Sequence, residues 1–412
     1  MQRVLPLVRA GELKRFKRFS RRGVVRGAAS LAALPFAGKL FIPAIAQAAP
    51  IKIGVLAPLS GIYSSLGMHL VNGIKMYFEE TDNKIAGRGV SLFTEDTEAK
   101  PQEGLRKARK LVESDQVDIL LGVISSGVGY AIKEYVSRAQ KVWIVGASGA
   151  AGIFKKSNLS PYAFRASLSV YQANAPLGTW LADKGYKRYL VTGPDYAMGR
   201  EAIEAFRGTF EVRGAQKVGE VIVPLGTNDF APYMAQIKKA EPDLVYASYA
   251  GTDAVRFVQQ FAAFGLSPAI KLAGFGYLVT EDILPAQKDA AVGVVSGLNW
   301  AYGLDTAENR RFIENYHKRY NQTATVDAVA GYVDAQVASE AIKSLGGVIR
   351  DQLQLSQAVA RLSFNSPRGP VSFDPATNNV IQNIFIREVR KQGEEYHNYV
   401  IATYENVRDP GD

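Results

Sequence analysis

The chain has 412 residues, 47% of them hydrophobic, so it is long enough for two or three domains, and it contains no cysteine. Disulfide bonds and thiolate metal sites are therefore excluded. The net charge is +10, but residues 1–48 hold ten Lys/Arg and one acidic residue and carry +9 of it. The nearly neutral remainder argues against a nucleic-acid partner, which would require clustered basic charge on the folded domain.

Residues 1–48 are predicted to be an export signal and not part of the fold. The segment 20–26 resembles the twin-arginine signal motif, a mildly apolar stretch follows at 27–41, and Ala46-Gln47-Ala48 fits the small-x-small pattern of a cleavage site. The apolar stretch is shorter than the roughly 20 residues of a membrane-spanning helix. A basic arm with an apolar anchor is the alternative. We expect a cleavable signal and a periplasmic mature protein.

The chain after residue 50 alternates between apolar strands and helical patterns. Strands are predicted at 51–57, 90–95, 117–121, 142–145 and 162–165. Helices are predicted to run to about residue 82, to begin after Lys100 and to begin at about Ser126. Pro101 stands near the start of the second helix, where proline is tolerated. Strands that alternate with helices of this length indicate a parallel sheet.

The alternation starts again at residue 188. Strands are predicted at 188–192, 218–223, 243–247, 271–273 and 292–295, with helices at 199–211, 230–240 and 252–264. The helix-rich stretch 306–362 must pack on a lobe already built, and late strands at 381–389 and 399–403 should extend a sheet edge. The fold class is therefore α/β, with two similar lobes, each a mostly parallel sheet flanked by helices.

The order of these elements predicts three crossings between the lobes, near 166–170, 296–300 and 366–372. We assign 51–168 plus 299–368 to an N-terminal lobe and 169–298 plus 369–405 to a C-terminal lobe. Three crossings make a hinge that is stiffer than one linker but can still bend.

Ser125 and Ser126 stand between a predicted strand and a predicted helix. Ligands of open α/β sheets bind at the carboxyl ends of the strands. The first N–H groups of a helix have no intrahelical partner and the helix dipole is positive there, so a carboxylate is favoured. Ala147-Ser148-Gly149 follows the next strand in the same way. Ordinary helix capping by these serines is the alternative.

Other chemistries have weaker signals. His69, His317 and His397 lie far apart without metal-ligand spacing, so neither a metal nor a cofactor is predicted. Residues 146–150 nearly match the nucleophile elbow G-x-S-x-G, but Ala150 fails its last position. Glycines at 146, 149 and 152 give a poor dinucleotide pattern, because Pro161 leaves too little room for the required helix.

Aromatic and apolar residues follow several of the predicted strands. Tyr63, Tyr249, Phe275 and Tyr277 fall in loops at strand ends, and Met198 opens a helix. Loop aromatics usually serve packing, but several at one expected cleft suggest the walls of a ligand pocket.

Residues 51 to about 404 resemble the periplasmic substrate-binding proteins of branched-chain amino-acid-type ABC transporters, of the Leu/Ile/Val-binding type. The resemblance rests on the order and spacing of four segments, 53–61, 122–126, 193–199 and 369–374. It implies a type I periplasmic binding fold with two Rossmann-like lobes, a three-segment hinge and closure on the ligand. It also implies a monomeric, non-catalytic receptor that delivers ligand to a membrane permease and ATPase complex.

The resemblance further implies where the ligand binds. In this family the position of Ser126 and the small residues at 147–149 supply donors to the ligand carboxylate, and amino-acid binders place a glutamate at the position of Gly276 to meet the ligand ammonium. An ammonium without a partner in a closed cleft would be costly. We therefore predict a carboxylate with an apolar or aromatic body. If Asp195 or Asp253 supplies the missing anion, the site can accept an amino acid, which is the alternative ligand.

The predicted ligand-binding residues are Tyr63, Ser125, Ser126, Ala147, Ser148, Gly149, Met198, Tyr249, Phe275, Gly276 and Tyr277. Arg200 has the wrong sign for a first helical turn, which suggests that it pairs with an acid or with the ligand carboxylate; an ordinary solvated arginine is the alternative. Two other functions stay open: a sensor of the same fold, and a serine hydrolase that uses Ser148.

Overall fold

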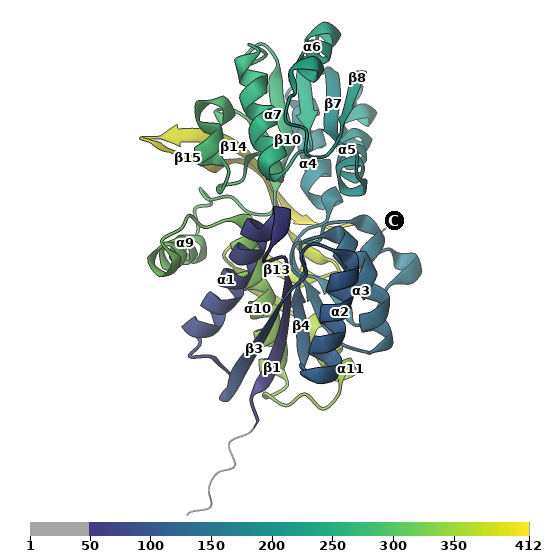
Figure 1. The fold of residues 1–412 in the computed structure, drawn as a ribbon, viewed down its shortest axis with the longest axis vertical. Helices are drawn as coiled ribbons and strands as arrows, with labels where there is room; N and C mark the ends of the chain where they lie inside the picture. The colour runs from purple at the N-terminus through teal and green to yellow at the C-terminus, as the bar shows by residue number, and fades with distance from the viewer. Residues whose placement is uncertain (1–48, 412) are drawn as a thin grey trace, which may run out of the picture. The chain divides into compact units, whose positions relative to one another are not determined.

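The computed structural model of the 412-residue chain describes residues 49–411 (Figure 1). The predicted export signal at 1–48 lies outside the described residues. Within the described part, none of the helices combines the length and apolar character that crossing a bilayer requires.

Six strands form the first sheet, in the order β2-β3-β1-β4-β5-β6. All neighbours in it are parallel except β2 and β3, which form a short hairpin. The strands are β1 (Ile51–Ala57), β2 (Lys84–Ile85), β3 (Arg88–Asp96), β4 (Ile119–Gly122), β5 (Trp143–Val145) and β6 (Ala163–Arg165). Because parallel neighbours require crossover connections, the carboxyl ends of β1, β4 and β5 meet at one edge.

Helices cover both faces of the first sheet (Figure 1). Ile119 and Leu121 of β4 pack toward α1 and α10, and Leu120 packs toward α2 and α3. Burial of both faces explains why β4 and β5 are continuously apolar and do not alternate with polar residues. The helices of this lobe are α1 (Ser64–Glu80), α2 (Pro101–Arg109), α3 (Ser126–Arg138), α9 (Ala307–Tyr320), α10 (Val326–Ser344) and α11 (Gln352–Ala360).

The second sheet has nine strands. Its path is β12-β13-β14-β11-β10-β9-β7-β8, and β15 pairs with β14. The strands from β7 to β11 are parallel to one another, whereas β12 to β15 pair antiparallel. The strands are β7 (Arg188–Pro194), β8 (Gln216–Val223), β9 (Leu244–Ala247), β10 (Lys271–Phe275), β11 (Val295–Leu298), β12 (Ser363–Ser366), β13 (Gly369–Phe373), β14 (Val380–Gln392) and β15 (Glu395–Val407).

Two layers of helices also cover the second sheet. Leu244 and Tyr246 of β9 pack with the α4 and α5 layer, whereas Val245 and Ala247 pack with the α6 and α7 layer. Successive residues of a strand face opposite ways, so one strand supplies both cores. The helices of this lobe are α4 (Val170–Asp183), α5 (Ala197–Phe210), α6 (Ala231–Ala240), α7 (Gly251–Ala263) and α8 (Leu284–Gln287).

The chain passes between the lobes where β6 gives way to α4, where β11 gives way to α9, and where α11 gives way to β12. The β12–β13 hairpin belongs by hydrogen bonding to the second sheet, yet Phe373 of β13 packs edge-on against Phe164 of β6, with ring centroids 5.5 Å apart. Gln382 of β14 donates through Nε2 to the carbonyl of Ser167 at 2.5 Å. The hairpin therefore joins both lobes, and the predicted lobe boundaries stay predictions.

The two-lobed α/β architecture is confirmed, and so is the strand-free stretch between 306 and 362. Several elements differ from the prediction. Helix α4 was not predicted, because it contains Pro176 and is buried on nearly every side, so it has no apolar stripe. The strand expected at 292–295 is β11, three residues later, and the crossing expected at 366–372 is occupied by the β12–β13 hairpin.

Candidate functional site

A cavity of about 220 Å³ lies between loops that follow strands of both sheets. Its size suits a small ligand better than a drug-sized one, which usually occupies roughly 300–1,000 Å³. The first lobe contributes Tyr63, Leu66, Ile124, Ser125, Ser126, Gly127, Tyr130, Ala147, Gly149, Ala150 and Leu168, and the second contributes Tyr196, Met198, Ala250, Phe275 and Tyr277.

The turn after β4 sets the position of the first helical wall. Gly122 has φ +98°, and a Cβ there would lie 2.4 Å from the carbonyl oxygen of Leu56, so only glycine fits. Val123 follows with φ +74°, a conformation that is unfavourable for a β-branched residue. Two hydrogen bonds hold it: its N–H donates to Leu56 at 2.9 Å, and its carbonyl accepts from Ala147 at 3.0 Å. This fixed turn directs the start of α3 at the cavity.

Ser125 and Ser126 are at the start of α3, on the cavity wall. Ser125 is the residue before the helix, but within the described chain its side chain makes no capping hydrogen bond. The capping alternative is therefore wrong for Ser125. By helix geometry the first N–H groups of α3 lack intrahelical partners and carry the positive end of the dipole. The arrangement provides donors and positive potential for an anion.

Ser148 does not line the cavity, contrary to its predicted place there. It is fully buried behind the wall, and its Oγ donates to Ser126 Oγ at 3.2 Å. This contact occupies an acceptor site of Ser126 and leaves the Ser126 O–H free to donate elsewhere. The structure thus places Ser148 as a support for Ser126. The three histidines are also outside the cavity lining, so a serine hydrolase site is not assembled.

The 147–150 loop forms the adjoining wall. Ala147, Gly149 and Ala150 line the cavity, as predicted for the first two. The N–H of Ala147 is already committed to Val123 and the carbonyl of Gly149 accepts from Val170 at 3.0 Å. Ala147 therefore contributes surface to the cavity and not a backbone donor.

Aromatic rings from both lobes form the remaining walls. Tyr63 ends the short helical turn η1 (Gly61–Tyr63). Phe275 ends β10 and Tyr277 follows it, with ring centroids 5.3 Å apart. Burial and the negative charge of Asp253 raise the pKa of Tyr63. The hydroxyl is therefore neutral at physiological pH, and the walls offer flat apolar faces with hydroxyl groups at their edges.

Tyr249 and Gly276 were predicted at the cavity, and the structure places both behind it. Tyr249 is 1% exposed; its hydroxyl lies 2.6 Å from Thr192 Oγ1, and its ring stacks on Phe257 in the core of the second lobe. The carbonyl of Gly276 accepts from Arg387 at 2.9 Å, and a Cβ at Gly276 would lie 2.7 Å from Leu298. No side chain fits at 276, so a glutamate there would require backbone or core movement.

The anions considered as partners of a ligand ammonium are engaged elsewhere. Asp195 pairs with Arg200, with Nε and Oδ1 3.0 Å apart, and both side chains are exposed. Asp253 accepts from the N–H of Gly226 at 2.8 Å and lies 3.8 Å from Arg256. Arg200 thus pairs with an acid, one of its two predicted roles. The residues lining the cavity in the described chain include no Asp, Glu, Lys, Arg or His.

Several lining residues were not predicted. Tyr130 lies one helical turn beyond Ser126, and that spacing of four could have identified it. Tyr196 lies in the loop 193–199, two residues before the predicted residue Met198, and this proximity could have identified it. The remaining lining residues missed by the prediction are Leu66, Ile124, Gly127, Ala150, Leu168 and Ala250. These are small or aliphatic residues without a distinguishing pattern.

Comparison with known proteins identifies the family. The chain matches the periplasmic binding protein family over residues 50–394. Leu/Ile/Val-binding protein homolog 6 of Brucella melitensis is 32% identical over 372 residues, 89% of this chain and 94% of the relative. A solute binding protein of an ABC transporter from Rhodopseudomonas palustris BisB5, in complex with 3,4-dihydroxybenzoic acid, is 33% identical with a TM-score of 0.83, covering 88% of this chain and 99% of that protein. An R. palustris solute binding protein in complex with 4-hydroxybenzoate is 30% identical with a TM-score of 0.82, covering 88% of this chain and 99% of that protein.

The chain therefore belongs to the periplasmic binding protein family and is of the Leu/Ile/Val-binding type. It is a substrate-binding protein of the ABC-transporter class and not an enzyme. Proteins of this class act outside the cytoplasm together with a membrane permease. The twin-arginine character of the signal stays a prediction.

Proposed function

We propose that this chain is the extracytoplasmic receptor of an ABC importer for a small carboxylate with an aromatic body. One observation carries the proposal: the cavity combines the open N-terminus of α3 with walls that, among residues 49–411, contain no charged side chain. A ligand with one negative charge at the end of an apolar body matches a cavity with one positive helix end and uncharged walls. The carboxylate would accept from the first N–H groups of α3 and from Ser126, as anions do at helix N-termini.

An α-amino acid fits this site less well. Its ammonium group would lose water and find no carboxylate among the lining residues, a cost of several kcal/mol. The tight packing at Gly276 also leaves no room for a compensating acid there. The two related R. palustris proteins, each in complex with a hydroxybenzoic acid, support an aromatic acid for this chain as well.

A calorimetric comparison of ligands tests the proposal. Benzoate and 4-hydroxybenzoate should bind at least about a hundredfold more tightly than leucine or valine, because the unpaired ammonium penalises the amino acids. Ser126→Ala should weaken benzoate binding by about tenfold, since it removes a donor to a charged group.

Ser137→Ala is the matched control, because Ser137 lies on the same helix and donates to the carbonyl of Lys133 at 2.8 Å, away from the cavity. It should leave affinity unchanged. Tighter binding of leucine than of any aromatic acid would overturn the ligand class, and equal effects of the two serine variants would overturn the carboxylate position.

A further inference from the structure

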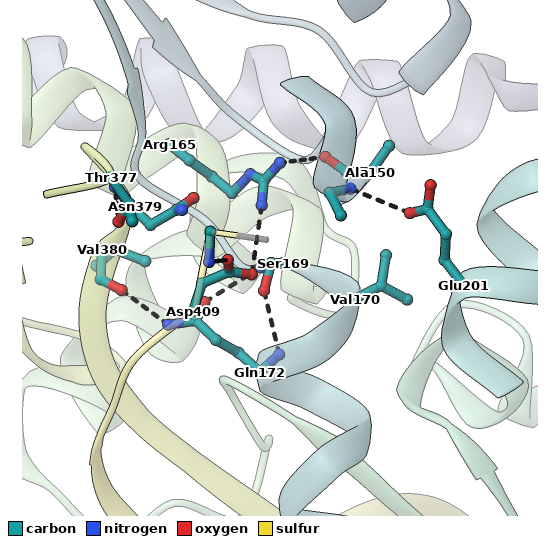
Figure 2. Close-up of polar contacts among 12 residues, drawn as sticks. Ala150, Arg165, Ser169, Val170, Gln172, Glu201, Thr377, Asn379, Val380 and Asp409 are labelled. Carbon is teal, nitrogen blue, oxygen red and sulfur yellow. Dashed lines mark hydrogen bonds and ion pairs between the residues drawn. The ribbon is translucent and has the colours of Figure 1, made fainter. Parts of the chain in front are cut away.

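Two charged side chains hold one peptide group at the edge of the cavity. Arg165 donates through Nη2 to the carbonyl of Ala150, and the N–H of Ala151 donates to Glu201 Oε2 at 3.0 Å (Figure 2). The carbonyl of Ala150 and the N–H of Ala151 belong to the same planar peptide unit. The two contacts therefore fix one plane from opposite sides, and Ala150 itself lines the cavity.

Arg165 polarises this peptide group. It is fully buried on β6, its guanidinium stacks over Phe154 at 4.5 Å from the ring centroid, and its Nη1 lies 4.0 Å from Asp409 Oδ2. Burial lowers its pKa to about 10, so it stays charged at neutral pH. A positive charge on the carbonyl side makes the N–H a better donor, and the anionic acceptor Glu201 strengthens that bond further.

Glu201 reaches Ala151 from the other lobe. It lies on α5, which packs against the second sheet, whereas Ala151 begins the short helical turn η3 (Ala151–Ile153) of the first lobe. Met198, one turn before Glu201, also lines the cavity. A separation of the two lobes that opens the cavity would break this hydrogen bond.

We propose that Glu201 is a positioning residue that retains the bound ligand, by holding the Arg165-polarised Ala150–Ala151 peptide across the lobes. The inference rests on the proposed function, since it assumes that the cavity is the ligand site. A contact made only in the closed arrangement slows ligand release and leaves ligand entry unaffected. Glu201 acts through the backbone and not by touching the ligand, as it is not a lining residue of the cavity.

Stopped-flow kinetics with 4-hydroxybenzoate tests this role. Glu201→Ala should raise the dissociation rate about tenfold with an unchanged association rate, because it removes a hydrogen bond to a charged group. Glu201→Gln keeps an acceptor oxygen and should recover most of the loss. Glu204→Ala is the matched control: Glu204 lies one turn further on α5, accepts from Arg207 at 2.7 Å and makes no hydrogen bond or ion pair across the lobes within residues 49–411.

Equal dissociation rates for the parent and Glu201→Ala, or equal increases in the Glu201→Ala and Glu204→Ala variants, would overturn the role of Glu201. If the parent binds no aromatic acid, the proposed ligand fails, and amide hydrogen exchange at saturation with leucine, the alternative ligand, then decides the present inference. Faster exchange of the Ala151 amide in Glu201→Ala than in Glu204→Ala supports the contact across the lobes; identical exchange rejects it.

Discussion

Asp327 is a buried carboxyl group at a second contact between the lobes. It is 1% exposed in the first turn of α10, where Oδ1 accepts from the hydroxyl of the cavity residue Tyr277 at 3.1 Å. Burial, and to a smaller extent the negative charge of Asp282, raise its pKa to about 8. Asp327 is therefore largely protonated in the folded protein at neutral pH, and it can itself donate a proton.

This carboxyl group predicts a pH dependence of stability. Between about pH 4, the unfolded pKa, and pH 8, the folded state holds a proton that the unfolded state releases, so the unfolding free energy falls as pH rises through that window. Asp327→Asn cannot ionise and should escape this loss. The stability difference between parent and variant should change by up to roughly 1.4 kcal/mol per pH unit in favour of the variant.

Urea denaturation of both proteins at pH 5, 6.5 and 8 measures this difference. Tyr277 and Tyr316 also lie near the group, but both stay neutral over this range because burial raises the pKa of each. Parallel curves for parent and variant across the three pH values would contradict the assigned protonation of Asp327.

The C-terminal segment 408–411 is an element that supports the cavity from behind. The carbonyl of Gly411 accepts from the N–H of Lys156 at 2.9 Å, and Asp409 Oδ1 accepts from the N–H of Gly411 at 2.7 Å. These bonds hold the buried Asp409 side chain opposite Arg165 (Figure 2). The segment thus supplies the countercharge for the guanidinium that holds the Ala150 carbonyl.

Loss of this countercharge should destabilise the protein. Asp409→Ala leaves the fully buried Arg165 without an anionic partner at 4.0 Å, which should lower the unfolding free energy by about 3 kcal/mol. Glu405→Ala, on the exposed part of β15, is the control and should change stability by less than about 0.5 kcal/mol. Similar denaturation midpoints for the two variants would show that Asp409 does not compensate Arg165.

The two lobes share one hydrophobic core cluster at the scale of the whole molecule. Phe164 and Leu168 of the first lobe belong to the same cluster as Leu298 and Trp300. Leu298 is the last residue of β11 in the second sheet, and Trp300 lies just after it. The β12–β13 hairpin adds further contacts between β6 and the second sheet. Neither lobe can unfold alone without exposing part of this cluster, so we expect the lobes to unfold together.

Scanning calorimetry tests this cooperativity. A single transition is expected, with equal calorimetric and van't Hoff enthalpies. Tryptophan emission and far-UV circular dichroism should follow the same curve, because Trp143 lies in the first lobe, Trp180 on α4 and Trp300 in the shared cluster. Two resolved transitions would show that the lobes are energetically independent.

Particular residues show how far the sequence could predict the site. Ser126 was found because a strand, a turn and a helix follow one another locally, and those signals lie within a few residues. Tyr249 was misplaced by the same argument, because the position after β9 is close to the cleft but the ring direction depends on packing against Phe257. Ser148 was misplaced because Gly129 and Ser126 close over it once α3 packs.

The sequence by itself determined the order of strands and helices, the α/β class with two lobes, and the strand ends at which a ligand would bind. Those features depend on local apolar pattern and turn chemistry. Tertiary structure alone decided which side chains at those ends face the cavity, the absence of space at Gly276, and the pairing of Glu201 with Ala151. These depend on contacts between segments 20 to 50 residues or more apart, and such contacts leave no periodic pattern in the chain.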